Sequence, residues 1–130
     1  MRLGCVLAAF TPLPAAEFVA VAREVERRGY HQAWVGEVSG YDAVSVMTLI
    51  ASATERLHVG SAVVPVQTRT PVVLGVTAAS LNHWAPGRVA LGLGLSSPTI
   101  VGDWHGLAFA PAIQQMREAV EIIRRVAAGE

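Results

Sequence analysis

The feature of this sequence that most constrains its fold is a pattern that occurs four times. Each time, a short apolar run precedes a segment in which apolar residues recur at helical spacing. The apolar runs begin near residues 3, 32, 57 and 88, so successive units are about 25 to 31 residues long. That length accommodates one strand, one helix and their connections. The sequence therefore predicts an α/β protein made of four consecutive βα units.

Three residues mark where the expected helices begin or end. Gly29 suits the end of the first helix, which is expected over residues 14–28. Asp42 is a suitable N-cap for the second helix, which is expected to reach about residue 54. Thr70, with a proline directly after it, is a suitable N-cap for the third helix.

The order of these elements limits the topology. Strands that alternate with helices form a parallel sheet with right-handed crossovers, either part of a (β/α)8 barrel or a small open doubly wound sheet. A complete barrel takes roughly 250 residues and eight units. We therefore expect residues 1–130 to form a single domain equivalent to the N-terminal half of a barrel. Four strands cut from a barrel expose two edges, so we also expect a homo-oligomer or a missing C-terminal half.

Composition excludes several functions. Ten arginines balance ten acidic residues without a basic run, which argues against nucleic acid as a partner. No apolar stretch reaches the ~18 residues of a membrane span, so a cytoplasmic protein is expected. The single cysteine, Cys5, forms no CxxC pair and is expected to be a buried packing thiol. No histidine pair has the spacing of metal ligands, so no metal site is expected.

The segment "RVALGLGLSSPTIVGDWHG" first suggests a dinucleotide site. Gly92 and Gly94 supply G-x-G, but the third glycine of that fingerprint is replaced by Ser97. The next helix is expected only over residues 111–128, after a long loop at 96–110. A strand over 88–93 that ends in glycines instead suits close approach of a flat ligand to the backbone. In a βα fold, that end of the sheet is where sites are built.

Several segments together resemble the bacterial luciferase-like oxidoreductases, and within them the branch that uses the deazaflavin coenzyme F420. They are "AWVGE" with "YDA", "TERLHVGSAVVPVQTRTP", "APGRVALGLGLSSP", "GDWHG" and "REAVEIIRRVAAGE". The resemblance implies a (β/α)8 barrel with the cofactor across its C-terminal rim. It also implies hydride transfer between coenzyme F420 and a small organic substrate. Two alternatives remain: an FMN-dependent monooxygenase of the same superfamily, and an incomplete half-barrel module without activity of its own.

The resemblance assigns two catalytic candidates. Glu37 stands where the deazaflavin enzymes carry an acidic residue near the ring, and it would assist proton transfer if burial raised its pKa. The alternative is a structural carboxylate bonded to backbone N–H groups before a helix. His105, beside Trp104 in "GDWHG", is a candidate proton donor. Arg69 is expected to be solvated, with the acidic tail of the deazaflavin as its alternative partner.

The resemblance also assigns cofactor-binding residues. Ser61, Ala62 and Val63 match a bulge that backs the ring, with a cis peptide expected between Ser61 and Ala62. An ordinary trans strand is the alternative. A second group, interpreted otherwise as a polar turn, matches the segment that contacts the ring or its side chain: Gly94, Leu95, Ser96 and Ser97.

Other residues are expected to be structural. Trp34 lies within the second strand, where packing in the core is its main prospect. His31 and His58 precede strands and are therefore expected at the end of the sheet opposite the site.

Overall fold

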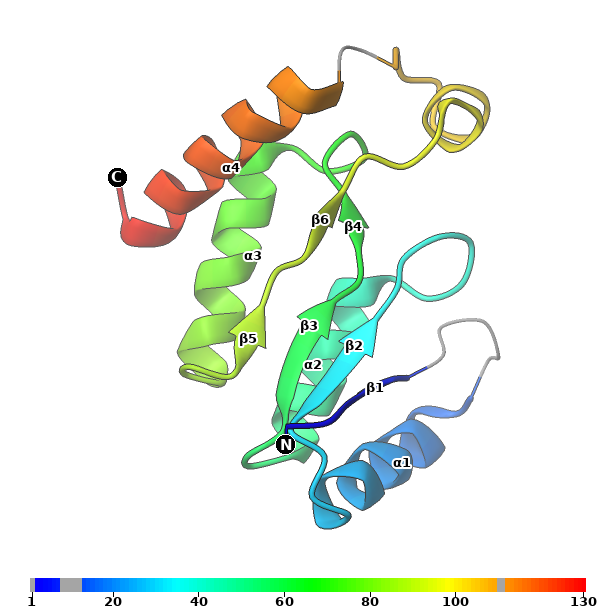
Figure 1. Ribbon diagram of the computed structural model, residues 1–130, viewed down its shortest axis with the longest axis vertical. Helices are drawn as coiled ribbons and strands as arrows, with labels where there is room; N and C mark the ends of the chain where they lie inside the picture. Colours follow the sequence, from blue (N-terminus) through cyan, green and yellow to red (C-terminus); the bar gives the residue numbers. More distant parts are fainter. Residues whose placement is uncertain (1, 8–12, 110–111) are drawn as a thin grey trace.

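The computed structural model describes residues 2–7, 13–109 and 112–130. Within them, one parallel sheet has four strands in the order β1 (Gly4–Val6), β2 (Gln32–Val35), β3 (His58–Ser61) and β5 (Val89–Ala90). Two further strands, also parallel, pair beyond the carboxyl ends of β3 and β5: β4 (Val64–Pro65) and β6 (Leu93–Gly94). Figure 1 shows how β4 and β6 extend the sheet upward. The predicted order of four parallel βα units is confirmed.

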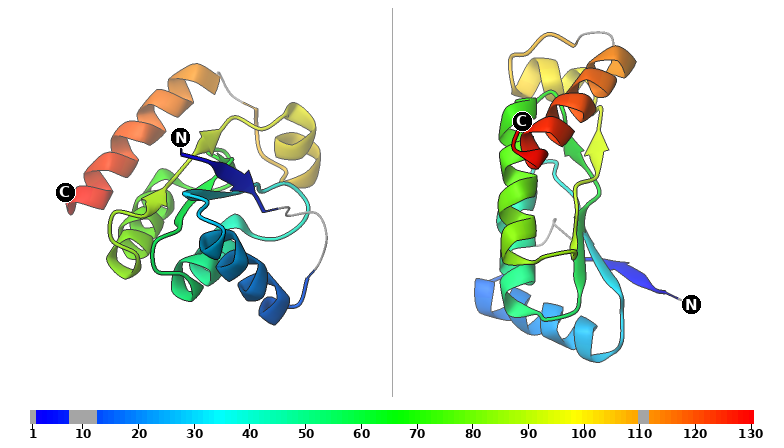
Figure 2. Two further views of the ribbon diagram at one scale, coloured as in Figure 1. Left: turned by 60° about the horizontal axis from the view of Figure 1, so that its bottom comes forward. Right: turned by 90° about the vertical axis from the view of Figure 1, so that its left-hand side faces the viewer.

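The α-helices are α1 (Ala15–Arg27), α2 (Ala43–Ala53), α3 (Pro71–Trp84) and α4 (Ala112–Ala128). Helices α1, α2 and α3 lie on one side of this sheet, and α4 packs against α3, as the right-hand view of Figure 2 shows. In β2, Ala33 and Val35 are fully buried beneath the helices, whereas Trp34 between them remains partly exposed. An open doubly wound sheet would have helices on both faces. Coverage of one face is the arrangement of a barrel wall, so the barrel prediction holds.

The core lies between the sheet and the helices. It contains the helical side chains Phe18, Met47, Ile50, Leu74 and Leu81, packed on Val35, Val59 and Val64 of the strands. Leu57, which precedes β3, is also fully buried. Dense apolar packing of this kind fixes the positions of the strand ends, where a site can be built.

Both predicted N-caps are confirmed. The Asp42 carboxylate accepts a hydrogen bond from the backbone N–H of Ser45 at 2.7 Å. The Thr70 hydroxyl accepts one from the N–H of Val73 at 3.4 Å. Each cap satisfies an N–H group that the first turn of a helix leaves without a partner.

Two predictions about the fourth unit need correction. The strand expected over residues 88–93 is divided into β5 and β6, with Leu91 and Gly92 between them. The loop expected over 96–110 contains a π-helical turn, η1 (Thr99–Trp104). Within this turn Val101 is fully buried, whereas Thr99, Asp103 and Trp104 are exposed. In the described part of the chain, no helix combines the length and apolar character that a membrane crossing requires.

Candidate functional site

A pocket of about 280 Å³ lies at the carboxyl ends of the strands. It collects residues from the ends of β1 and β4 and from beyond β2, β3 and β6. The lining residues are Val6, Gly36, Glu37, Val38, Ala62, Val63, Pro65 and Ser96. Four of them, Glu37, Ala62, Val63 and Ser96, were predicted from the sequence. The other four were missed: Gly36 and Val38 follow β2 and could have been found from that position, whereas Val6 and Pro65 depend on where β1 and β4 end.

Glu37 is the charged member of this pocket, and both of its carboxylate oxygens are bonded. Its Oε2 accepts from the backbone N–H of Ala43 at 2.9 Å, in the first turn of α2. The guanidinium of Arg69 donates to Oε2 at 3.0 Å and to Oε1 at 3.3 Å. The backbone bond is the one expected for a structural carboxylate before a helix. In any catalytic role, Glu37 would therefore act while it is paired with Arg69.

Arg69 is not solvated as the sequence led us to expect. Its side chain is only 23% exposed and bridges Glu37 to the carboxylate of Asp42. The bond to Glu37 is the main reason that the pKa of Arg69 lies above its ordinary value. Burial opposes ionisation of Asp42, but its bonds to Ser45 and its attraction to Arg69 outweigh this and lower its pKa. The three side chains form one cluster of charged groups at the edge of the pocket.

The cis peptide expected between Ser61 and Ala62 lies instead one residue later, between Ala62 and Val63. The reason is that Ser61 still belongs to β3, where it pairs with Val35. The N–H of Ala62 continues that ladder by donating to the carbonyl of Val35 at 2.6 Å. The irregular bond therefore begins only after the ladder ends, and both of its residues line the pocket.

Ser61 joins two strands rather than lining the pocket. Its side chain is buried, and its hydroxyl donates to the carbonyl of Gly92 at 2.8 Å and accepts from the N–H of Gly92 at 2.9 Å. A Cβ on Gly92 would lie 2.1 Å from the Ser61 carbonyl oxygen, and one on Gly94 would lie 2.2 Å from Cγ2 of Val63. Both glycines are therefore explained by strand packing. The interpretation that they make room for a ligand is not needed.

The other residues of the segment predicted to contact the ring, residues 95–97, have different surroundings. Ser96 lines the pocket in a left-handed backbone conformation, with φ of 54°. Ser97 does not line the pocket. Its hydroxyl accepts a hydrogen bond from the N–H of Ile100 at the start of η1. Leu95 is half-buried and packs against the core. Among these four positions, only Ser96 reaches the pocket.

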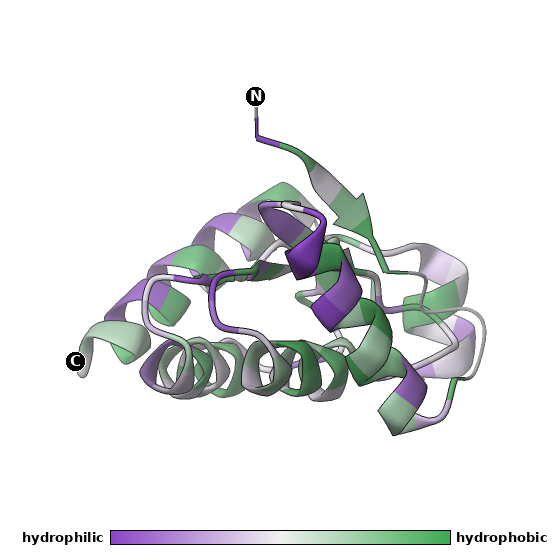
Figure 3. Cartoon of the chain, turned by 90° about the horizontal axis from the view of Figure 1, so that it is seen from below, coloured by the Kyte–Doolittle hydropathy of each residue, from purple (hydrophilic) through white to green (hydrophobic). Residues whose placement is uncertain are grey.

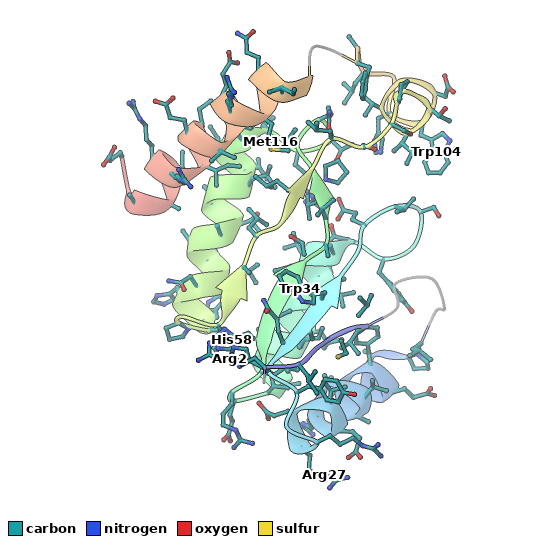
Figure 4. The ribbon with its side chains drawn as sticks, in the orientation of Figure 1. Arg2, Arg27, Trp34, His58, Trp104 and Met116 are labelled. Carbon is teal, nitrogen blue, oxygen red and sulfur yellow. The ribbon has the colours of Figure 1, made fainter. Side chains whose placement is uncertain are left out.

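His105 is not brought to the pocket. It follows η1 and is exposed, as is the neighbouring Trp104. Figure 4 shows Trp104 directed outward from this turn and well separated from Trp34 on the sheet. The role of His105 as a proton donor remains a prediction. The exposed position of His105, outside the pocket, does not support it.

Trp34 lies on the face of the sheet that carries no helix in the described residues. A Cβ on Gly60 would lie 2.5 Å from Cζ3 of Trp34, and one on Gly4 would lie 3.1 Å from its Nε1. The indole therefore rests across two neighbouring strands that carry glycine beneath it. Trp34 was expected in the core, and it is only partly buried in the described residues. Among the described residues, no three His, Cys, Asp or Glu side chains are grouped as metal ligands.

Comparison with known proteins agrees with this geometry. The family model described as luciferase-like monooxygenase matches residues 1–130. The chain belongs to this family. It is 32% identical over 130 residues to a protein of Mycobacterium tuberculosis that is assigned by name to the coenzyme F420-dependent oxidoreductases. That match covers the whole of this chain and 38% of the relative, so the chain spans about two fifths of the relative's length.

Solved structures of this family share the fold. The coenzyme F420-dependent tetrahydromethanopterin reductase of Methanopyrus kandleri matches 95% of this chain and 39% of its own, with a TM-score of 0.82 and 22% identity. A second match is the oxygenating constituent of 3,6-diketocamphane monooxygenase from Pseudomonas putida, in complex with FMN. It covers 97% of this chain and 39% of its own, with a TM-score of 0.83 and 15% identity. At these identities the likeness shows the fold alone. The four βα units of this chain are the N-terminal half of such a barrel.

Proposed function

We propose that this luciferase-like oxidoreductase holds the ring of coenzyme F420 in the pocket at the carboxyl ends of its strands. The observation that carries the proposal is the convergence of four strand ends on one pocket that has both apolar and polar walls. Sites in (β/α)8 proteins lie at this end of the sheet. The relative assigned by name to the F420-dependent oxidoreductases supports the choice of cofactor.

The residues present fit such a group. Val6, Val38, Val63 and Pro65 supply apolar surface for a flat ring, while Glu37 and Ser96 supply polar atoms at its edge. The volume of about 280 Å³ lies just below the ~300–1,000 Å³ of complete ligand pockets. The pocket therefore suits the ring portion of a cofactor whose remaining parts extend beyond it.

When bound, the deazaflavin supplies hydride transfer to or from a small organic substrate. The part of this chain is to bind and orient. Ala62 and Val63, which line the pocket, would help to hold the ring. The Ser96 hydroxyl is available as donor or acceptor at its rim. Glu37, held by Arg69 and by the N–H of Ala43, places a fixed negative charge beside the site.

FMN is the second candidate cofactor, with a monooxygenase reaction. Its support is the structural likeness to a family member that binds FMN. The isoalloxazine ring of FMN has the same shape as the deazaflavin ring, so the pocket described above suits either. Discrimination between the two cofactors depends on their remaining parts.

The edges of the sheet are part of the proposal. In the described residues, β1 and β5 each pair with a neighbour on one side only. The strands that cover these edges would come either from a further stretch of chain or from a second copy of this chain. Without such strands, the four βα units form an incomplete module. The mass of the protein in solution, measured by light scattering, separates a homo-oligomer from a monomer.

The test is a titration of the protein with coenzyme F420 and, separately, with FMN, followed by tryptophan fluorescence. Val6→Phe fills the pocket from a side chain that is 71% exposed, so it is expected to weaken binding at least tenfold without loss of folding. Leu3→Phe is the matched control, because Leu3 is exposed near the same strand but does not line the pocket. Saturable binding of FMN alone would replace the first cofactor by the second. Equal affinities for wild type and Val6→Phe would show that the pocket is not the site.

A further inference from the structure

The loop between β2 and α2 supplies a large part of the pocket. It comprises residues 36–42, of which Gly36, Glu37 and Val38 line the pocket. Within the described part of the chain, the first six positions of this loop take part in no backbone-to-backbone hydrogen bond. Residues 38–40 are exposed. The backbone by itself therefore does not fix the shape of the β2–α2 loop.

The two elements that the loop joins are fixed by other means. Strand β2 is paired with β1 on one side and with β3 on the other. Helix α2 is held by apolar packing, since its turns are mainly green and pale in Figure 3, and Val46, Met47 and Ile50 are buried. The β2–α2 loop therefore has fixed ends, and its side chains decide the path between them.

Tyr41 connects the loop to the segment before α1. Its hydroxyl accepts a hydrogen bond from the backbone N–H of Leu13 at 2.6 Å and donates one to the carbonyl of the same residue at 2.9 Å. The phenol ring packs edge-on against Phe18 of α1, with ring centroids 6.2 Å apart. A tyrosine hydroxyl both donates and accepts, so Tyr41 uses both capacities on one backbone position of the neighbouring βα unit.

Arg69 connects the same loop to the segment before α3. Its guanidinium bonds to the carboxylates of Glu37 and Asp42, which lie near the two ends of the loop. The carboxylate of Asp42 also caps α2 through the N–H of Ser45. Together, Tyr41 and Arg69 join the connections of three consecutive βα units at the carboxyl end of the sheet.

These contacts lie outside the pocket itself. Leu13, Tyr41 and Arg69 do not line it. Their hydrogen bonds can therefore act on a ligand only through the shape of the loop. A loop that is already in its binding conformation does not have to be ordered when a ligand binds, which increases affinity. Conversely, affinity falls with the fraction of protein in which the loop has that conformation.

We propose that Tyr41, together with Arg69, is a positioning residue that holds the β2–α2 loop in the shape that forms the cofactor pocket. This inference rests on the proposed function of the pocket, but the state of the loop is measurable without a cofactor. Tyr41→Phe is the first variant, because it removes one oxygen atom and keeps the ring beside Phe18. Substitution of Arg69 by a neutral residue also changes the charge beside the pocket.

A nitroxide spin label reports on the loop directly. In a Cys5→Ala background, Ser39→Cys places the label at an exposed loop position that does not line the pocket. The mobile fraction of the electron paramagnetic resonance spectrum is expected to increase in Tyr41→Phe. Tyr30→Phe makes the same change before β2, at the other end of the sheet, and is expected to leave the spectrum unchanged. A label that is equally immobile in Tyr41→Phe and in the wild type overturns the proposal.

Titration with coenzyme F420 and with FMN, followed by tryptophan fluorescence, measures the consequence for binding. Tyr41→Phe is expected to weaken binding of the cofactor that the wild type binds by about fivefold. Tyr30→Phe is expected to retain the wild-type affinity. A mobile loop with undiminished affinity also overturns the proposal. If the wild type binds neither cofactor, the proposed function fails, and the spin-label spectra still decide whether Tyr41 holds the loop.

Arg69→Lys is the second variant, and it replaces Tyr41→Phe if that variant does not fold. It keeps the positive charge, but a single ammonium group replaces the fork with which the guanidinium reaches two carboxylates. A partial increase in label mobility and a partial loss of affinity are expected. Wild-type mobility and affinity in this variant overturn the contribution of Arg69. Circular dichroism verifies that each variant is folded.

Discussion

The two ends of the sheet use polar side chains in opposite ways. At the amino end, Glu26 of α1 accepts hydrogen bonds from the N–H groups of Glu55, Arg56 and Leu57, the shortest at 2.6 Å. Every one of these bonds is to backbone. At the carboxyl end, Arg69 bonds to the carboxylates of Glu37 and Asp42, and a pocket adjoins them.

Arg88 illustrates the amino end further. Its guanidinium donates to the carbonyls of Ala51 and Leu57, both at 3.0 Å, and to the hydroxyl of Thr54 at 3.3 Å. These contacts fasten the end of α2 to the start of β3 and β5. The comparison teaches that the amino end is fastened mainly by bonds to the backbone, while the carboxyl end places a cluster of charged side chains beside a pocket. In (β/α)8 proteins the same division separates stabilising from functional residues.

The largest effect is expected for Arg88→Met. It leaves three acceptors without their donor, so the free energy of unfolding is expected to fall by about 3 kcal/mol. Cofactor affinity of the folded protein is expected to be unchanged, because Arg88 lies at the opposite end of the sheet. Urea denaturation and the cofactor titration measure the two quantities. Arg56→Met, at an exposed arginine, is the control, and a weakened cofactor affinity in Arg88→Met would break the comparison.

Glu26→Gln is expected to cost about 1 kcal/mol at pH 7, because a neutral amide is a weaker acceptor for the three N–H groups. Burial opposes ionisation of Glu26, but the N–H groups of Arg56, Leu57 and Glu55 outweigh it and lower its pKa. A lowered pKa stabilises the fold above the pKa of the unfolded chain, near 4.5, and this stability is lost as pH falls further. Denaturation between pH 7 and 3 should show the wild type converging on the variant. Glu17→Gln, on the exposed side of α1, should behave as wild type throughout.

Ser96→Gly sharpens the comparison at the carboxyl end. Glycine adopts a φ of 54° without the steric cost that serine has there, so stability is expected to be unchanged or higher by up to about 1 kcal/mol. Loss of the hydroxyl is expected to weaken cofactor binding about fivefold, equivalent to one neutral hydrogen bond. Ser96→Ala separates the two effects, since it loses the hydroxyl without gaining the backbone freedom. Undiminished affinity in both variants would remove Ser96 from the site.

The smallest effect concerns His58 at the amino end. Burial, together with the nearby His31, Arg2 and Arg88, lowers the pKa of His58. Figure 4 shows His58 and Arg2 together at this end, and the rings of His58 and His31 are 4.3 Å apart. The unfolded chain therefore takes up this proton first, and stability falls as pH decreases below about 6.5. We expect a decrease of a few tenths of a kcal/mol between pH 7 and 5, absent in His58→Gln.

Much of the fold could be predicted because its signals are local. The N-caps Asp42 and Thr70 and the helical spacing depend only on residues a few positions apart. The position of the cis peptide could not be predicted in the same way, since it depends on where the ladder between β2 and β3 ends. Likewise, the neighbouring residues in the sequence do not indicate that Val101 of η1 is fully buried.

The sequence by itself determined the βα order and the starts of two helices, because periodicity and capping act over short distances. Only the tertiary structure decided which polar groups bond to residues distant in the sequence. Arg69 bonds to Glu37, which is 32 residues away in the sequence, and Ser61 bonds to Gly92, which is 31 residues away. Such pairs arise when strands distant in sequence are placed side by side, and no short-range pattern records which side chains then face each other.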